Sequence, residues 1–361
     1  MLRLSVVATV AAVLLAARPA SACTTLCMSR GKEVIVAKSY DFNVGNGLVL
    51  RNRRGVAKEA MLVSQGKAKP SRWVSRYGSL TFNQYGRELP LGGMNERGLV
   101  VEIMWLTATR HPPLAADKEA VNELQLIQYL LDSCATTREA VAAAKRLQID
   151  KVHAPVHYMV CDRAGQCATI EDIGGNRVIH RGKTLPVRVL TNNPYAASLR
   201  YLRRHKGFGG KEAIPHTPAS LARFARAATH ARAFTRSKGD RRIAAFSALE
   251  DVRQGDFTKW QIVYEPLRGE VSFRKAGEDG FTTAKVEAKD CNAPVEVMDL
   301  FGTLIKGKRA FVPYTFELNR TLIQKSFKEL GARFPPPVLE MLARYPEALK
   351  CTHGAKEPKK P

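Results

Sequence analysis

The sequence predicts an α+β protein built as a four-layer αββα sandwich, in which two antiparallel β-sheets lie between outer layers of helices. Strand-type runs dominate the first hundred residues, two amphipathic helices follow, and a second set of strands precedes the largely helical C-terminal part. This order lacks the strict strand–helix alternation of a parallel sheet. No linker or internal repeat divides the 361 residues, so a single domain is expected.

The expected strands are short apolar or alternating runs bounded by turn residues. They cover residues 33–37, 47–51, 77–82, 98–104, 155–161, 167–171, 177–180 and 187–191, with a late hairpin over 259–264 and 270–274. A turn is expected over residues 92–97, because Gly and Asn adopt turn conformations readily. The expected helices have apolar residues three and four apart, or begin at a cap or a first-turn proline. They cover residues 121–131, 137–146, 195–205, 220–234, 243–252 and 322–349, apart from the prolines at 335–337.

The first 22 residues have the three parts of an export signal. Arg3 precedes an apolar run over residues 4–17, and Ala20-Ser21-Ala22 forms a small-residue cleavage site. The apolar run is too short to cross a bilayer. The protein is therefore expected to be exported, either periplasmic or secreted. Its mature domain should cover residues 23–361 and end in a basic tail from about residue 352.

The formal charge of +24 raises the question of an anionic partner. Nucleic-acid binding is the first interpretation of such a basic chain. Export argues against it, and the positive charges are scattered apart from the C-terminal tail. A basic surface in peripheral contact with an anionic envelope fits better. We therefore expect no nucleic-acid partner.

The cysteine content is odd, which leaves at least one free thiol or an intermolecular pair in an exported protein. Cys161 and Cys167 flank a predicted hairpin loop and could face each other, and Cys291 with Cys351 is a second candidate pair. The sequence alone does not determine the pairing. The seven cysteines occupy positions 23, 27, 134, 161, 167, 291 and 351.

No group of residues has the spacing of a zinc site. His153 and His157 are four residues apart, but they enter a predicted strand and need not share a face. No third ligand accompanies them. We therefore expect neither a metal ion nor a cofactor.

A chain cut after Ala22 would begin with Cys23, which then carries a thiol nucleophile and a free α-amine. The amine is a base with a pKa of about 7.7–8.0, so one residue supplies both the nucleophile and its base. Lipidation is the alternative, since lipoprotein signals also end in small residues followed by cysteine. A lipid-anchored binding protein would have both groups blocked. Ala20 stands where such signals usually have leucine, which favours the enzyme.

Two polar segments at predicted strand ends could serve such a cysteine. Lys38-Ser39-Tyr40-Asp41 offers a cation that favours the thiolate and a carboxylate that orients the amine. Thr191-Asn192-Asn193-Pro194 offers a side-chain amide for an oxyanion. Each segment is also explained as an ordinary strand end, since Asn tolerates turns and Pro ends the ladder.

Taken in order, these segments resemble the choloylglycine hydrolase / penicillin V acylase family. The resemblance covers residues 23 to about 274, and the order of the motifs is that of the family. It implies an N-terminal-nucleophile hydrolase fold and cleavage of linear amides other than peptide bonds. The motifs are Cys23-Thr24-Thr25, KSYD (38–41), GMNERGLVVEIMW (93–105), HYMVCDRAGQCATIE (157–171), VLTNNP (189–194), ARFAR (222–226) and WQIVY (260–264).

The resemblance also implies roles for five residues. Cys23 matches the nucleophile, and Asp41 matches the carboxylate that holds its amine. Asn192 matches an oxyanion-hole side chain, and Trp105 lies where a backbone N–H donor is expected. Arg223 matches a structural or catalytic arginine of the family.

Lys38 departs from the family, whose bile-salt and penicillin enzymes usually have arginine there. Lysine keeps the charge but loses the planar fork of guanidinium. The substrate is expected to be a small N-acyl amide, such as penicillin V, an N-acyl homoserine lactone or a bile-salt-like compound. Loops over residues 106–117 and 207–218 are expected to build the pocket. Members of this family also form dimers or tetramers, so a homo-oligomer is implied.

Overall fold

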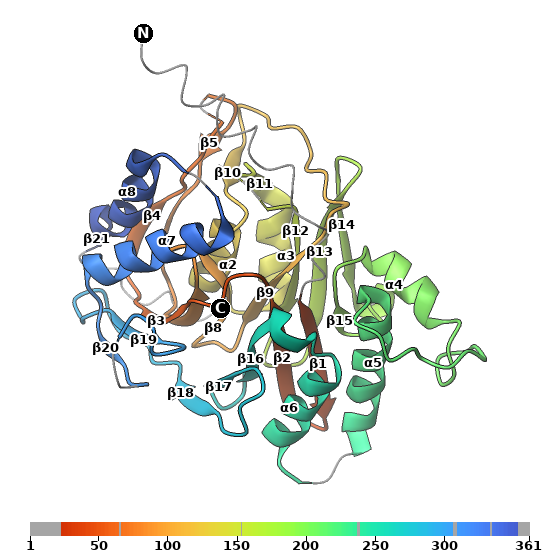
Figure 1. The fold of residues 1–361 in the computed structure, drawn as a ribbon. Coiled ribbons are helices and arrows are strands. Elements are labelled where there is room, and N and C mark those ends of the chain that lie inside the picture. Colours follow the sequence, from red (N-terminus) through yellow and green to blue (C-terminus); the bar gives the residue numbers. More distant parts are fainter. Residues whose placement is uncertain are drawn as a thin grey trace.

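The computed structural model describes residues 23–352, except residues 65, 153, 237–238, 306–308 and 333 (Figure 1). The predicted leader, His153 and the tail beyond residue 352 lie outside the described residues. Among the described helices, none is long and apolar enough to cross a membrane.

Two large sheets form the centre of the molecule, and every strand pair within them is antiparallel. The six-stranded sheet has the order β15 (Val189–Leu190), β1 (Thr24–Arg30), β2 (Glu33–Asp41), β16 (Thr258–Glu265), β17 (Glu270–Lys275) and β18 (Thr282–Lys285). The nine-stranded sheet has the order β14 (Asn176–Arg181), β13 (Cys167–Ile173), β12 (Val156–Cys161), β9 (Val100–Trp105), β8 (Pro90–Asn95), β7 (Ser79–Asn83), β3 (Leu48–Asn52), β19 (Glu296–Asp299) and β20 (Val312–Pro313).

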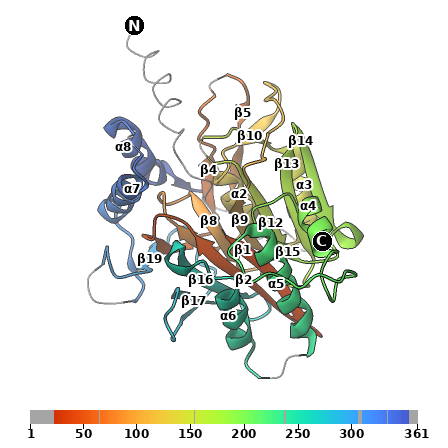
Figure 2. The same ribbon diagram turned by 45° about the vertical axis from the view of Figure 1, so that its right-hand side comes forward.

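Helices cover the sheets on both outer sides, which confirms the predicted αββα sandwich (Figures 1 and 2). On the six-stranded sheet, α5 (Ser220–Ala233) packs on β1 and α6 (Arg241–Asp251) packs on β2 and β16, with α4 (Tyr195–Leu202) against α5. On the nine-stranded sheet, α2 (Gln125–Ser133) packs on β8 and β9, and α3 (Thr137–Arg146) packs on β12 and β13. The main apolar core contains buried residues from both sheets, such as Leu26, Val101 and Val263.

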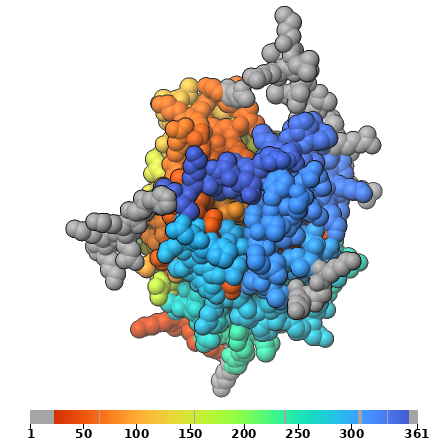
Figure 3. Space-filling view, turned by 90° about the vertical axis from the view of Figure 1, so that its left-hand side faces the viewer, coloured from red at the N-terminus to blue at the C-terminus, as the bar shows by residue number. Residues whose placement is uncertain are grey.

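The C-terminal segments lie at one end of the sandwich and form one face of the molecule, blue in Figure 3. There α7 (Phe316–Leu330) packs against α8 (Pro336–Arg344). Smaller elements complete the fold. They are a parallel sheet of β11 (Gln148–Ile149), β10 (Glu119–Val121) and β5 (Lys69–Pro70), an antiparallel sheet of β21 (Lys350–Cys351), β4 (Val56–Glu59) and β6 (Arg72–Val74), and the 3-10 turns η1 (Gly182–Thr184), η2 (Phe234–Arg236), η3 (Gly255–Phe257) and η4 (Tyr345–Ala348).

Some predicted boundaries were wrong for identifiable reasons. Residues 92–97 were expected to form a turn, but strand β8 runs to Asn95, and the turn is confined to Glu96 and Arg97, just before Gly98 with a φ of 77°. Gly92 is glycine because its neighbour leaves no room, since a Cβ there would lie 2.4 Å from a Glu102 carboxylate oxygen.

The helix expected from residue 121 begins later. Val121 still belongs to β10, and α2 starts at Gln125. The Asn122 side-chain oxygen accepts hydrogen bonds from the backbone N–H groups of Leu124 (3.0 Å) and Gln125 (2.7 Å), which fixes the start. The C-terminal helix starts earlier than expected, because Thr315 caps α7 through the Leu318 N–H.

Both candidate disulfides are present. Cys161 and Cys167 are direct partners in the β12–β13 register, and Cys291 is bonded to Cys351. Cys23, Cys27 and Cys134 are free, and all three are buried. The odd count therefore corresponds to three free thiols in this structure.

Candidate active site

Cys23 lies immediately before β1, and only 5% of its surface is exposed. Its backbone has a φ of 43°, a left-handed conformation that is uncommon outside glycine. The Sγ atom lies 3.9 Å from the backbone oxygen of Asp41. Burial raises the pKa of the Cys23 thiol, and the Lys38 ammonium opposes this shift. The thiol is therefore a weak nucleophile until a base removes its proton.

Asp41 ends β2 beside this cysteine, because the β1–β2 register pairs Thr24 with Ser39. Its carboxylate is fully buried. One oxygen accepts hydrogen bonds from Ser39 Oγ (2.7 Å) and Thr258 Oγ1, and the other accepts from Gln254 Nε2 (2.7 Å). These donors hold the carboxylate in one orientation.

Arg223 connects the cysteine to the end of β15. Its fully buried guanidinium donates through Nη1 to the Cys23 carbonyl (2.9 Å) and to Thr24 Oγ1 (2.6 Å). Through Nη2 it donates to Asn192 Oδ1 (2.7 Å), and through Nε to the Pro218 carbonyl (3.0 Å). A single side chain of α5 therefore fixes the positions of Cys23 and Asn192.

Arg223 also lies close to Asp41, with Nη1 3.9 Å from a carboxylate oxygen. Burial lowers the pKa of the Arg223 guanidinium, and the Asp41 carboxylate opposes this effect. The pair compensates two charges that would each be costly to bury alone.

Asn192 lies two residues beyond Leu190, which ends β15. Because its Oδ1 faces the Arg223 guanidinium, its Nδ2 faces the other way and donates to the Trp105 carbonyl (2.9 Å). Nδ2 carries two hydrogens, and this contact uses one of them. The contact seen at Trp105 involves its carbonyl oxygen, so the donor role of its N–H stays a prediction.

Lys38 is buried in the middle of β2 rather than exposed at a strand exit. Its Nζ lies 3.2 Å from Glu102 Oε2 and 3.4 Å from Met104 Sδ, and it donates to the Ile103 carbonyl. The other oxygen of Glu102 accepts from the Tyr264 hydroxyl (2.5 Å). Burial raises the pKa of the Glu102 carboxyl, with Lys38 opposing the shift.

The ion pair changes what Lys38 can do for the Cys23 thiol. The lysine charge lowers the pKa of the Cys23 thiol, while the Glu102 charge raises it. The two effects oppose each other, so Lys38 does not act as a lone cation. No role was predicted for Glu102 from the sequence, although an acidic residue inside the apolar run GLVVEIMW indicates a buried charge that needs a partner. Gln254, which donates to Asp41, has no feature in the sequence that points to this contact.

Cys23 lies on the wall of a cavity with an empty volume of about 1230 Å³, part of which is open to solvent. The prediction that residues 106–117 and 207–218 build this pocket was wrong, because neither segment contributes to the lining. The C-terminal helices fold over this end of the sandwich and take their place. The lining is mainly apolar and includes Tyr40, Phe42, Leu62, Tyr85, Leu91, Ile103, Met104, Trp105, Leu124, Phe327, Leu330, Phe334, Val338 and Leu342.

One group of possible metal ligands is close enough to share an ion among the described residues, namely Cys27, Cys161 and Cys167. Two of these sulfurs form a disulfide, so the group does not make a metal site. His157 bonds Glu171 (2.8 Å) and the Thr191 carbonyl (2.6 Å), which gives it a structural place just before Asn192.

Comparison with known proteins agrees with this fold. The chain is 31% identical over 171 residues to a penicillin V acylase from Pectobacterium atrosepticum, a match that covers 43% of this chain and 45% of that protein. The match therefore spans less than half the length of that relative.

Two solved structures share the fold. A penicillin V acylase from Agrobacterium tumefaciens has a TM-score of 0.69 and 24% identity, covering 81% of this chain and 98% of that one. A conjugated bile acid hydrolase from Clostridium perfringens has a TM-score of 0.64 and 15% identity, covering 81% and 97%. Residues 23–232, more than half of the sequence, match the model of one family. The chain belongs to the choloylglycine hydrolase family of linear amide C–N hydrolases.

Proposed function

We propose that the mature protein begins at Cys23 and is an exported cysteine hydrolase that cleaves N-acyl amides through an acyl-enzyme. The contact set of Arg223 carries this proposal. It joins the backbone of Cys23 to the side chain of Asn192, beside an apolar cavity that Cys23 itself lines. Cys23, the Asn192 side chain and the cavity therefore lie together, which supports their proposed roles.

In this mechanism the Cys23 α-amine, oriented by Asp41, takes the thiol proton through a water molecule. The thiolate attacks the acyl carbonyl, and a C–S bond forms. The developing oxyanion accepts hydrogen bonds from Asn192 Nδ2 and the Trp105 N–H. The protonated amine then gives its proton to the leaving nitrogen as the C–N bond breaks. Water hydrolyses the thioester and restores the thiol.

The substrates proposed are small N-acyl amides, including penicillin V, N-acyl homoserine lactones and bile-salt-like amides. The apolar lining of the cavity suits the acyl part of such compounds better than a charged group. Penicillin V is a reasonable first compound, because the relative from Pectobacterium atrosepticum is a penicillin V acylase.

The test is a panel of N-acyl amides assayed for released amine, with Cys23→Ala and Cys23→Ser beside the wild type. We expect both variants to fold and to lose hydrolysis, and we expect a stalled acyl-enzyme in the wild type to show the acyl mass on Cys23. Cys134→Ser is the matched control, since it alters another buried free thiol. Wild-type turnover in Cys23→Ala would refute the nucleophile assignment.

Processing is tested separately, by N-terminal sequencing and intact mass of the exported protein. A free Cys23 terminus supports the enzyme. A mass increase of diacylglycerol size on Cys23 would support the lipid-anchored binding protein instead, because that modification blocks both the thiol and the amine.

The proposal includes a periplasmic or secreted location, peripheral contact with an anionic envelope, and a homo-oligomer. The net charge supports envelope contact, and family resemblance supports the dimer or tetramer. Cell fractionation, co-sedimentation with anionic vesicles at low and high salt, and analytical ultracentrifugation test the three statements in turn.

A further inference from the structure

The cavity beside Cys23 has a wall that comes from the far end of the chain. Phe327 and Leu330 of α7, Phe334 between the helices, and Val338 and Leu342 of α8 all line it. These residues lie outside the segment that matches the family model, which ends at residue 232. The wall is therefore a feature of this chain's own C-terminal part.

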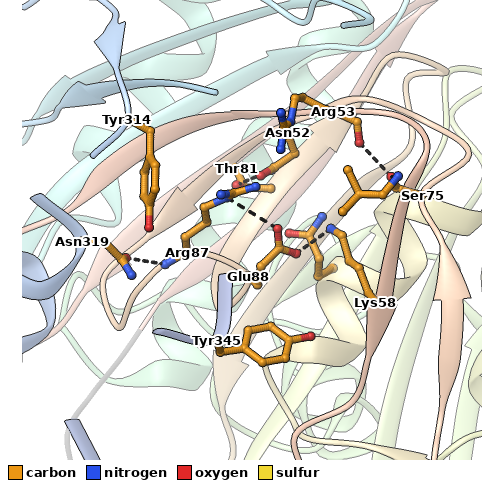
Figure 4. Close-up of polar contacts among 12 residues, drawn as sticks. Asn52, Arg53, Lys58, Ser75, Thr81, Arg87, Glu88, Tyr314, Asn319 and Tyr345 are labelled. Carbon is orange, nitrogen blue, oxygen red and sulfur yellow. Dashed lines mark hydrogen bonds and ion pairs between the residues drawn. The ribbon is translucent and has the colours of Figure 1, made fainter. Parts of the chain in front are cut away.

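Polar contacts hold α7 in a fixed position against the sandwich (Figure 4). The Arg87 backbone N–H donates to Asn319 Oδ1 (2.8 Å), and Asn319 Nδ2 donates to the Ala343 carbonyl on α8 (3.2 Å). The Arg87 guanidinium lies 5.0 Å from the Tyr314 ring centre and 3.7 Å from a Glu88 carboxylate oxygen. One loop of the sandwich thus fixes both helices.

The end of α8 is fixed in the same way. The Tyr345 hydroxyl donates to the Glu59 carbonyl (2.6 Å) and accepts from Gln125 Nε2 (3.2 Å). The disulfide between Cys291 and Cys351 ties the chain beyond α8 to the loop before β19. A wall held at this many points is pre-formed, which is what a selective pocket requires.

The mouth of the same cavity is unusually apolar. Val63, Val152 and Met341 line it, and they are 53%, 43% and 58% exposed. They are three of the seven large hydrophobic side chains that stand exposed among the described residues. Exposed apolar side chains gathered around a groove mark a surface that a ligand covers.

The carboxylate and the side-chain amide of the lining, Glu123 and Asn122, are already occupied. The Glu123 carboxylate accepts hydrogen bonds from the backbone N–H groups of Val152 (2.8 Å) and Ala154 (2.9 Å). Asn122 uses its amide oxygen at the start of α2 and its nitrogen on Gln125 Oε1 (2.9 Å). Polar substituents on a ligand would gain little from these groups, whereas methylene groups would be well accommodated.

We propose that α7 and α8 form the specificity wall for the acyl part of the substrate, and that this part is an unsubstituted aliphatic chain. The chain lies along the wall from Cys23 toward the mouth, and Met341 covers its distal end. This inference rests on the proposed hydrolysis by Cys23 and adds the acyl class and the residues that select it.

The test uses straight-chain N-acyl amides of increasing length on one common amine. In the wild type, kcat/KM should rise about fourfold for each methylene that reaches the wall. Leu330→Trp fills space along the wall and should lower kcat/KM for the longest chains roughly fifteenfold, the effect of about two methylenes. It should leave kcat/KM for the shortest substrate unchanged. Met341→Ser should lower kcat/KM only for the longest chains, by about fourfold.

Leu267→Ser is the matched control for the mouth, because Leu267 is 45% exposed and does not line the cavity. Calorimetric binding of the same amides to Cys23→Ala gives a second readout that does not need turnover. If neither wild type nor variants release amine, the proposed hydrolysis fails. If amine is released but the wall variants change short and long substrates equally, the specificity wall is wrong.

Discussion

Replacing Asn192 tests the oxyanion site directly, since the structure fixes which way its amide points. Oδ1 lies 2.7 Å from Arg223 Nη2, and Nδ2 lies 2.9 Å from the Trp105 carbonyl. Asn192→Asp keeps an acceptor for Arg223 but removes the N–H donor and adds negative charge where the oxyanion forms. Asn192→Ala removes both contacts.

The magnitude follows from counting hydrogens. Trp105 uses one of the two Nδ2 hydrogens, so at most one can reach the substrate. Losing one oxyanion donor typically lowers kcat by a factor of about 10²–10³, or about 2.7–4 kcal/mol of transition-state stabilisation. We expect Asn192→Ala to fall in this range. Asn192→Asp should lose at least as much, because its charge repels the oxyanion.

The assay is steady-state hydrolysis of an N-acyl amide, with kcat and KM reported separately and thermal unfolding as a check on folding. A donor that acts in the transition state affects kcat more than KM. The neighbouring Asn193→Ala is the matched control and should retain wild-type turnover. If Asn192→Asp keeps kcat within tenfold of the wild type, Asn192 is not an oxyanion donor.

Three further predictions concern stability and pH. Lys38→Met should lower the free energy of unfolding in urea by about 3–5 kcal/mol, because it leaves Glu102 buried without its partner. The double variant Lys38→Met with Glu102→Leu should recover most of this loss, and equal stabilities of the single and double variants would contradict the buried pair. Cys291→Ser should lower the free energy of unfolding in denaturant by about 4 kcal/mol and Cys161→Ser by about 2 kcal/mol, because the loops closed by the two disulfides span 60 and 6 residues. The reverse order would show that loop length does not determine these two losses of stability. Because burial raises the pKa of the Cys23 thiol above its ordinary value of 9.0, the rate of Cys23 alkylation should keep rising beyond pH 9.0, and a rate that levels off below pH 9.0 would contradict this. Above pH 9.0 the free energy of unfolding should also fall relative to Cys23→Ala, since the thiol of the unfolded chain loses its proton first.

The layered fold could be predicted because it depends on local patterns. Strands such as β9 and β12 are apolar runs bounded by turn residues, and the helices of both outer layers show spacings of three and four. Strand and helix boundaries that depend on tertiary contacts could not be predicted from the sequence. Gly92 looks like a turn residue in sequence, yet it lies in strand β8, where the Glu102 carboxylate packs against it and leaves no room for a side chain.

The site could be predicted only in part. Cys23, Asp41, Asn192 and Arg223 lie together as their motifs indicated. The partner of Lys38 and the source of the cavity wall were missed, because both join segments more than sixty residues apart. Nothing in the local sequence of α7 distinguishes a helix that lines a pocket from one that covers a core.

The left-handed backbone of Cys23 has a consequence for the proposed cut before this residue. A non-glycine residue held in this region costs about 1–3 kcal/mol. The torsion φ is defined by the carbonyl carbon of the preceding residue, Ala22. If the chain is cut between Ala22 and Cys23, that atom leaves and the torsion ceases to exist, together with its cost. The uncut chain would then store a small free energy at this bond, and the proposed cut would release it, so that the shorter chain would be the more relaxed one.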